Sequence, residues 1–130
     1  MSETGVASQV RLDAANRGVH LWRNNTGVLL NQDGRPVRYG LANDSSRLNK
    51  RIKSSDLIGI TPIMITPDMV GQVVGVFTAI ETKEQNWHYR PSDDHSVAQK
   101  KFHDIVISAG GYAGFATCVE EFRRIIRHGV

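Results

Sequence analysis

Residues Val73–Lys83 read VVGVFTAIETK, the longest β-like stretch of the chain, rich in Val, Phe, Thr and Ile. Because residues i and i+2 of a strand point to the same face, we expect Glu81 and Lys83 to project together, with Thr82 on the other side. Such an acid can hold a hard cation, while the lysine orients water or offsets phosphate charge. The alternative is a solvated strand edge with a cross-strand ion pair.

A second segment, SSDLIG at residues 54–59, places Asp56 at the edge of another short apolar run. Alone, Asp56 also suits a turn or a helix N-cap. An acid from one strand beside an acid and a lysine from another is the arrangement of a metal-dependent nuclease. The literal Pro67-Asp68 pair is followed by Gly71 and is better interpreted as a turn, so Asp56 is favoured over Asp68.

A basic cluster precedes Asp56, with Arg47, Lys50, Arg51 and Lys53 inside seven residues. It suits a polyanion whose scissile phosphate must approach carboxylates, and the net charge of +3 is compatible with nucleic acid. The alternative is a solvated loop.

Size and composition indicate one globular domain over residues 1–130, since 40% of residues are hydrophobic and 22% charged. No apolar run approaches the roughly 20 residues of a membrane helix, and the N-terminus lacks signal-peptide features. We therefore expect a cytoplasmic protein with no membrane partner. The absence of glycine-rich phosphate loops predicts no nucleotide cofactor.

Cysteine and histidine usage argues against a zinc site. The single Cys118 excludes an internal disulfide and is expected to be a buried thiol. The histidines lack zinc-site spacing and are predicted to be ordinary surface residues: His20, His88, His95, His103 and His128.

The pattern of elements predicts an α/β fold. Helices are expected at 2–17, 96–109 and 120–128, and strands at 19–23, 28–30, 35–41, 56–60, 63–65, 73–83 and 112–118. This order predicts an α/β sandwich around a central mixed sheet. Its last β-α-β unit, ending at residue 118, is expected to be a right-handed parallel crossover.

Taken in order, Arg23-Asn24-Asn25-x-Gly27, the segment around Asp56, Ile80-Glu81-x-Lys83, Gln99 and Gly110-Gly111 resemble a virus-type replication-repair nuclease (VRR-NUC) domain. This domain belongs to the PD-(D/E)xK nuclease superfamily, and the resemblance covers about residues 9–119. It implies a restriction-endonuclease-like sandwich with helices flanking the central mixed sheet.

The resemblance also implies roles for individual residues. Asp56 and Glu81 would bind Mg²⁺ or Mn²⁺, with the backbone carbonyl of Thr82 as a further ligand. Lys83 would position the attacking water or stabilise the phosphorus centre. Gln99 would hydrogen-bond within the site, its alternative being an exposed helix residue.

One position departs from the family. A glutamate on the first helix usually contacts the metal, and the sequence places Gln9 there. A glutamine oxygen can bind a hard cation but brings no charge, which leaves one or two metals open. Glu3 would substitute only if the helix register differs.

We expect DNA contacts from seven residues: Arg23, Asn24, Asn25, Lys50, Arg51, Lys53 and Lys100. Lys100 could equally be a solvated helix charge. Trp87 is either a DNA or dimer contact or a hydrophobic anchor of its own loop.

The implied activity is a metal-dependent, structure-selective DNA endonuclease for repair. The resemblance favours a homodimer that resolves four-way (Holliday) junctions, in a phage or bacterial cytoplasm. Alternatives are a flap or branched-DNA nuclease and a catalytically weak DNA-binding module.

Overall fold

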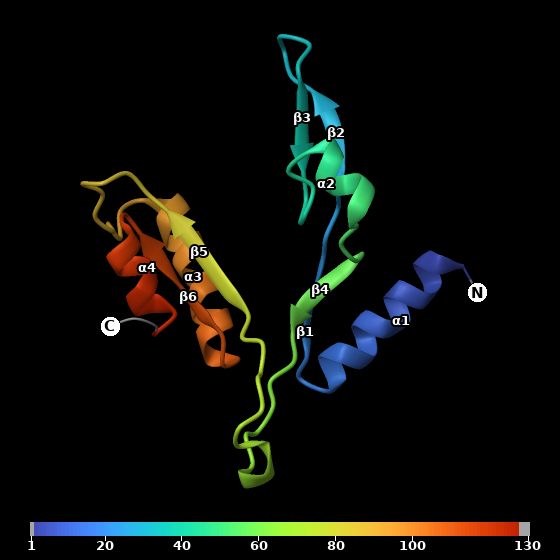
Figure 1. Ribbon diagram of the computed structural model, residues 1–130, viewed down its shortest axis with the longest axis vertical. Helices are drawn as coiled ribbons and strands as arrows, with labels where there is room; N and C mark the ends of the chain where they lie inside the picture. The colour runs from blue at the N-terminus through green and yellow to red at the C-terminus, as the bar shows by residue number, and fades with distance from the viewer. Residues whose placement is uncertain (1, 128–130) are drawn as a thin grey trace. The chain divides into compact units, whose positions relative to one another are not determined.

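The computed structural model describes residues 2–127 and is mixed α/β (Figure 1). The elements are α1 (Glu3–Asn16), β1 (His20–Arg23), β2 (Gly27–Leu30), β3 (Pro36–Tyr39), α2 (Ser46–Arg51), β4 (Leu57–Ile60), a 3₁₀ turn (Pro67–Met69), β5 (Thr78–Thr82), α3 (Asp94–Ser108), β6 (Tyr112–Ala116) and α4 (Val119–Ile125). The strands form three two-stranded sheets, β1–β4, β2–β3 and β5–β6. The chain divides into two compact units, residues 1–59 and 60–130.

The first unit begins with α1. The helix is capped by Ser2, whose hydroxyl accepts a hydrogen bond from the Gly5 N–H at 3.1 Å. Val6, Val10 and Ala14 recur every four residues along this helix, but only Ala14 is buried, while Val6 and Val10 are 49% and 44% exposed. The chain leaves the helix at Gly18, whose φ of +74° favours glycine.

A β-hairpin follows, with β2 and β3 antiparallel and Gly27 opposite Tyr39. Its turn contains the sequence Asn-Gln-Asp-Gly, in which the Asn31 side-chain oxygen accepts hydrogen bonds from the N–H groups of Asp33 and Arg35. Beyond the hairpin, the buried Asn43 side chain donates to the carbonyls of Gly27 and Tyr39, at 2.9 and 2.8 Å. Asn43 therefore fixes both strands to the segment that leads toward α2.

The second unit is built on β5 and β6, which run parallel as expected for the predicted crossover. A Cβ added at Gly111 would lie 2.7 Å from Val106 of α3, and one at Gly114 would lie 2.9 Å from Ile125 of α4. Within β6, the Phe115 ring contacts His103 of α3, and the adjacent residue Gly114 points to the other face of the sheet. Hence α3 and α4 cover opposite faces of the β5–β6 sheet.

The expected central mixed sheet is not formed by the described strands, and the predicted strand at 63–65 and the first part of 73–83 are not strands. Residues 61–77 instead run out to the 3₁₀ turn and back (Figure 1). Apolar β-branched composition predicts a strand only where a neighbouring strand satisfies the backbone. Here Met64, Val70 and Val73 are 83%, 82% and 99% exposed.

Three further predictions concern membrane-spanning helices, Cys118 and the C-terminal residues. No helix within residues 2–127 combines the length and apolarity needed to cross a membrane. The expectation of a buried Cys118 is wrong, since its thiol is exposed directly before α4. The predicted end of the last helix and His128 lie outside the described residues.

Candidate active site

Asp56 lines a pocket of about 290 Å³ in the first unit, referred to below as the Asp56 pocket. Its lining residues come from α1, from the end of β1 and from the start of β4: Glu3, Thr4, Ala7, Ser8, Arg11, Arg23, Asn24, Asn25, Asp56 and Leu57. Two carboxylates and two guanidinium groups therefore share one small cavity. This composition suits a cation together with the phosphate it would bind.

Asn24 holds the backbone around Asp56 in place. Its N–H donates to the Asp56 carbonyl at 2.8 Å, and its side-chain amide donates to Ser54 Oγ at 2.8 Å and the Ser55 carbonyl at 2.9 Å. Its side-chain oxygen accepts from the Leu41 N–H at 3.1 Å. Asn24 is thus a positioning residue for Asp56, and its predicted contact with DNA stays a prediction.

Gln9, the residue of the first helix that the sequence predicts beside the metal, does not line the Asp56 pocket. Gln9 is exposed on α1 and is not among the residues lining the Asp56 pocket, whereas Glu3 is. Glu3, Ala7 and Arg11 recur every four residues and so share one helix face, from which Gln9 is rotated away. The carboxylate that accompanies Asp56 in the pocket is therefore Glu3.

The predicted basic residues are distributed over several surfaces. Lys53 lines a neighbouring pocket of about 340 Å³ together with Arg38 and Asp56, and its ammonium donates to the Asn49 side-chain oxygen at 2.7 Å. Arg23 and Asn25 line the Asp56 pocket. Lys50 and Arg51 are exposed in the last turn of α2. Lys100, on α3, is exposed and forms an ion pair with Asp104 at 3.3 Å.

In the second unit, Glu81 and Lys83 lie on the face of the β5–β6 sheet that α3 covers. Glu81 is in register with Phe115 of β6, so the two side chains share a face. The ladder continues one residue beyond β5, because the Lys83 N–H donates to the Ala116 carbonyl at 3.0 Å. The Lys83 ammonium lies 5.8 Å from the Phe115 ring centroid, which places it on the same face.

The face of α3 that meets this sheet is mostly polar. Its stripe has the 3-4-3 spacing of one helix face and consists of Ser96, Gln99, His103 and Val106. Ser96 and Val106 are fully buried and His103 is 6% exposed. Gln99 Oε1 is buried without a hydrogen-bond partner, so Gln99 is not the exposed helix residue that was the alternative.

A polar stripe on the buried face indicates a site rather than a core. Two large apolar side chains of α3, Phe102 and Ile105, are by contrast 37% and 42% exposed. A search for polar residues at 3-4-3 spacing would have found the stripe.

The expectation that His103 is a surface histidine is wrong. Its ring meets the Phe115 ring edge-on, with the centroids 4.7 Å apart. Burial lowers the pKa of His103 below its ordinary value, against the opposing influence of Glu81 and Asp104, while Lys100 lowers it further. The imidazole next to this face is therefore held toward its neutral form.

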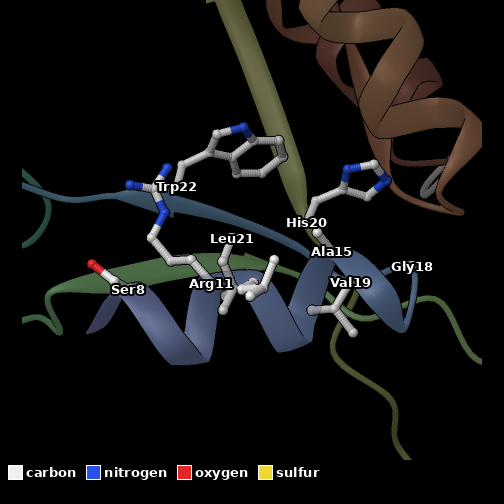
Figure 2. Close-up of a pocket in the computed structure, with 9 residues that line it drawn as sticks. Ser8, Arg11, Ala15, Gly18, Val19, His20, Leu21 and Trp22 are labelled. Carbon is white, nitrogen blue, oxygen red and sulfur yellow. The ribbon is translucent and has the colours of Figure 1, made fainter. Parts of the chain in front are cut away.

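A larger hollow of about 730 Å³ lies between α1 and β1 (Figure 2). Leu21 points from β1 toward α1, whereas His20 and Trp22 lie on the opposite face and stack with centroids 6.0 Å apart. The residues lining this hollow include Arg11 but no carboxylate. Without a carboxylate it is a poorer site for a hard divalent cation, so the Asp56 pocket is the better candidate in this unit.

Comparison with known proteins leaves the family untested. No model of a known protein family matches the chain, and no curated protein or solved structure matches it. Within residues 2–127, no group of three or more His, Cys, Asp or Glu side chains is placed to hold a metal ion.

Proposed function

We propose that this chain is a metal-dependent DNA endonuclease of the VRR-NUC type with a restriction-endonuclease-like fold. The observation that carries the proposal is the face shared by Glu81 and Lys83, which α3 covers with a buried polar stripe. An apolar sheet–helix contact would be the more stable packing, since burying polar groups is costly unless they are paired. The unpartnered oxygen of Gln99 has a use if a ligand donates to it or is bound by it.

The proposed metal is Mg²⁺ or Mn²⁺. Asp56 and Glu81 are the proposed metal-binding carboxylates, with the Thr82 carbonyl as a further ligand and Glu3 as the acid that accompanies Asp56. All of these are hard oxygen donors. When bound, the metal would supply Lewis-acid stabilisation of the phosphate and a more acidic water.

The protein's own groups have separate tasks in this proposal. Lys83 orients the attacking water or offsets charge at the phosphate, and Gln99 hydrogen-bonds within the site. Arg23 and Lys53 are placed in pockets that also contain Asp56, where they would bind backbone phosphates.

The proposed substrate is branched DNA, with the four-way junction first and flaps as the alternative. A junction carries two opposed scissile strands, and the resemblance favours a homodimer with two sites. The second candidate function is a DNA-binding module with weak or no catalysis. It is favoured by the lack of a three-ligand metal cluster within the described residues.

A cleavage assay tests the proposal. Purified protein is incubated with end-labelled four-way junction, flap, splayed and linear DNA in Mg²⁺, Mn²⁺ or EDTA. We expect metal-dependent paired nicks in the junction and a loss of about 10²-fold or more in Glu81→Gln and Asp56→Asn, because each amide keeps one oxygen but removes the negative charge that holds the metal. Asp68→Asn is the matched control, since Asp68 is an exposed carboxylate on the 3₁₀ turn.

The outcomes separate the alternatives. Cutting of flaps alone keeps the nuclease and rejects junction resolution. Tight binding without cleavage of any substrate supports the binding module. The metal concentration for half-maximal cleavage should rise in Glu3→Gln and change little in Gln9→Ala, because Glu3 shares the pocket of Asp56.

A further inference from the structure

The ammonium group of Lys83 lies beside two aromatic rings. Lys83 Nζ is 5.2 Å from the centroid of the Trp87 ring and 5.8 Å from that of Phe115. Both distances are within the range in which a cation is attracted to an aromatic face. We propose that Trp87 and Phe115, called the aromatic clamp below, position Lys83 for the cleavage reaction, an inference that rests on the proposed nuclease function.

The rings of the clamp are themselves fixed. Phe115 belongs to β6 and packs against the Trp87, Tyr89 and His103 rings, with centroids 4.7, 5.9 and 4.7 Å away. Trp87 also closes a backbone turn, in which its N–H donates to the Glu84 carbonyl at 3.0 Å. The loop after β5 is therefore anchored by its own tryptophan onto the sheet, directly beside the lysine.

The aromatic clamp can hold the ammonium group of Lys83 without offsetting its positive charge, which an ion pair would not do. A carboxylate partner would hold the ammonium but would also offset its charge, whereas an aromatic face holds the cation and leaves the charge intact. The two ion pairs of the described chain are Arg17–Asp13 and Lys100–Asp104, and neither involves Lys83. A lysine side chain is otherwise a flexible stem, so the rings restrict where its charge lies.

Trp87 is therefore a positioning residue that acts through Lys83. If the lysine is misplaced, cleavage should slow while DNA binding is preserved, because phosphate contacts elsewhere supply the affinity. Displacement of a catalytic group by about 1 Å can cost about 10²-fold in rate. We expect Trp87→Leu to lower the single-turnover cleavage rate by about ten- to a hundredfold, within that bound.

The experiment compares three variants in cleavage and in DNA affinity. Trp87→Leu removes the aromatic face, and Trp87→Phe keeps one. Tyr89→Leu removes a ring that packs on both clamp rings, with centroids 6.5 Å from Trp87 and 5.9 Å from Phe115, but for which no contact with Lys83 is described, so it controls for lost packing. We expect Trp87→Phe to recover most of the rate and Tyr89→Leu to stay within about threefold of the parent, as for a change outside the clamp. Equal rate losses in Trp87→Leu and Tyr89→Leu would overturn the proposal, because the loss would then be one of packing.

A second readout does not depend on catalysis. Urea unfolding of the parent, Lys83→Met, Trp87→Leu and the double variant forms a double-mutant cycle. We expect the effect of Lys83→Met on the unfolding equilibrium constant to shrink by about two- to fivefold when Trp87 is absent, which is the size of an exposed cation–π contact. If the effects of Lys83→Met and Trp87→Leu on unfolding are strictly additive, the proposal of the aromatic clamp is overturned, whether or not the protein cuts DNA.

The two readouts distinguish failure of the clamp from failure of the nuclease. If the double-mutant cycle shows coupling but the protein cleaves no substrate, the nuclease proposal is rejected and the contact between Lys83 and Trp87 is retained. If the leucine variant does not fold, Trp87→Met takes its place in both measurements, since it also lacks an aromatic face.

Discussion

His103 shows how one buried side chain links the candidate site to the stability of the fold. Its ring is 6% exposed and packs on Phe115. Burial lowers its pKa more than the acids Glu81 and Asp104 raise it, and Lys100 adds to the lowering. The folded protein therefore binds a proton at this position less readily than the unfolded chain does.

This difference in proton binding makes the free energy of unfolding depend on pH, in a direction that can be stated. Between the ordinary histidine pKa of about 6.5 and the lower folded value, the unfolded state binds more protons, so the free energy of unfolding falls as the pH drops below about 7. We expect His103→Gln to flatten this dependence between pH 7.5 and 5. Urea unfolding measured across that range provides the test.

The exposed loop residue His88 supplies the matched control, His88→Gln, which should keep the slope of the parent. The assignment to His103 is rejected if both variants show the parent's slope. Carboxylates with lowered pKa, such as Asp93 and Glu121, lose their contribution only in more acidic solution, below about pH 4.5.

At the residue scale, sequence patterns were informative where geometry is local. The alternation of a strand is enough to place Glu81 and Lys83 on one face. His103 was missed because its helix has a stronger apolar pattern on another face, and only the packed sheet reveals which face is buried. The sequence favours Gln9 over Glu3 because spacing along α1 does not show which of its residues line the pocket of Asp56.

Among the elements, β4 depends on a glycine at its centre. A Cβ on Gly59 would overlap the His20 carbonyl oxygen of β1, so the two strands approach more closely than any other residue allows. The same strand begins directly after Asp56, whose carbonyl accepts the Asn24 N–H. The position of Asp56 therefore depends on close pairing of β1 and β4.

Gly59→Ala should destabilise the first unit by about 1–3 kcal/mol, the usual range for overpacking. Gly75→Ala is the matched control, because no atom lies within 4 Å of its added Cβ and its φ is not positive. The control should change the free energy of unfolding by less than about 1 kcal/mol. Urea unfolding of the two variants measures both effects, and equal stabilities would show that β4 can shift without cost.

Elements with local start and stop signals agreed best with expectation. Predicted at 96–109, α3 spans Asp94–Ser108, capped by Asp93 and ended before Gly110 and Gly111. The predicted strand at 63–65 lacked such a basis, because a strand is defined by its partner and the sequence of one strand does not name it.

On the scale of the whole molecule, few apolar side chains are shielded from solvent within residues 2–127. The buried apolar residues there are Ala14, Ile60, Val106 and Ala116. Leu12, Leu30 and Ile65 are among the large apolar side chains left 66% to 72% exposed. A chain of this length ordinarily buries about two thirds of its unfolded surface, and the proposed homodimer would cover part of the apolar surface that these side chains expose.

A dimer that contributes to stability makes unfolding depend on protein concentration. We expect the thermal midpoint to rise over a hundredfold increase in protomer concentration, by mass action worth about 2.7 kcal/mol. Sedimentation equilibrium over the same range should give a mass twice the 14.4 kDa of one chain. A monomeric mass and a constant midpoint at every concentration would contradict the dimer.

The placement of the two tryptophans has a practical consequence. Trp22 lies in β1 of the first unit and Trp87 in the loop after β5 of the second, and the chain has no other tryptophan. Each unit thus contains one tryptophan. Under excitation selective for tryptophan over tyrosine, the emission of Trp22→Phe comes from Trp87 alone, so its spectrum and quenching report the surroundings of Lys83 directly. Trp87→Phe reports the first unit in the same way.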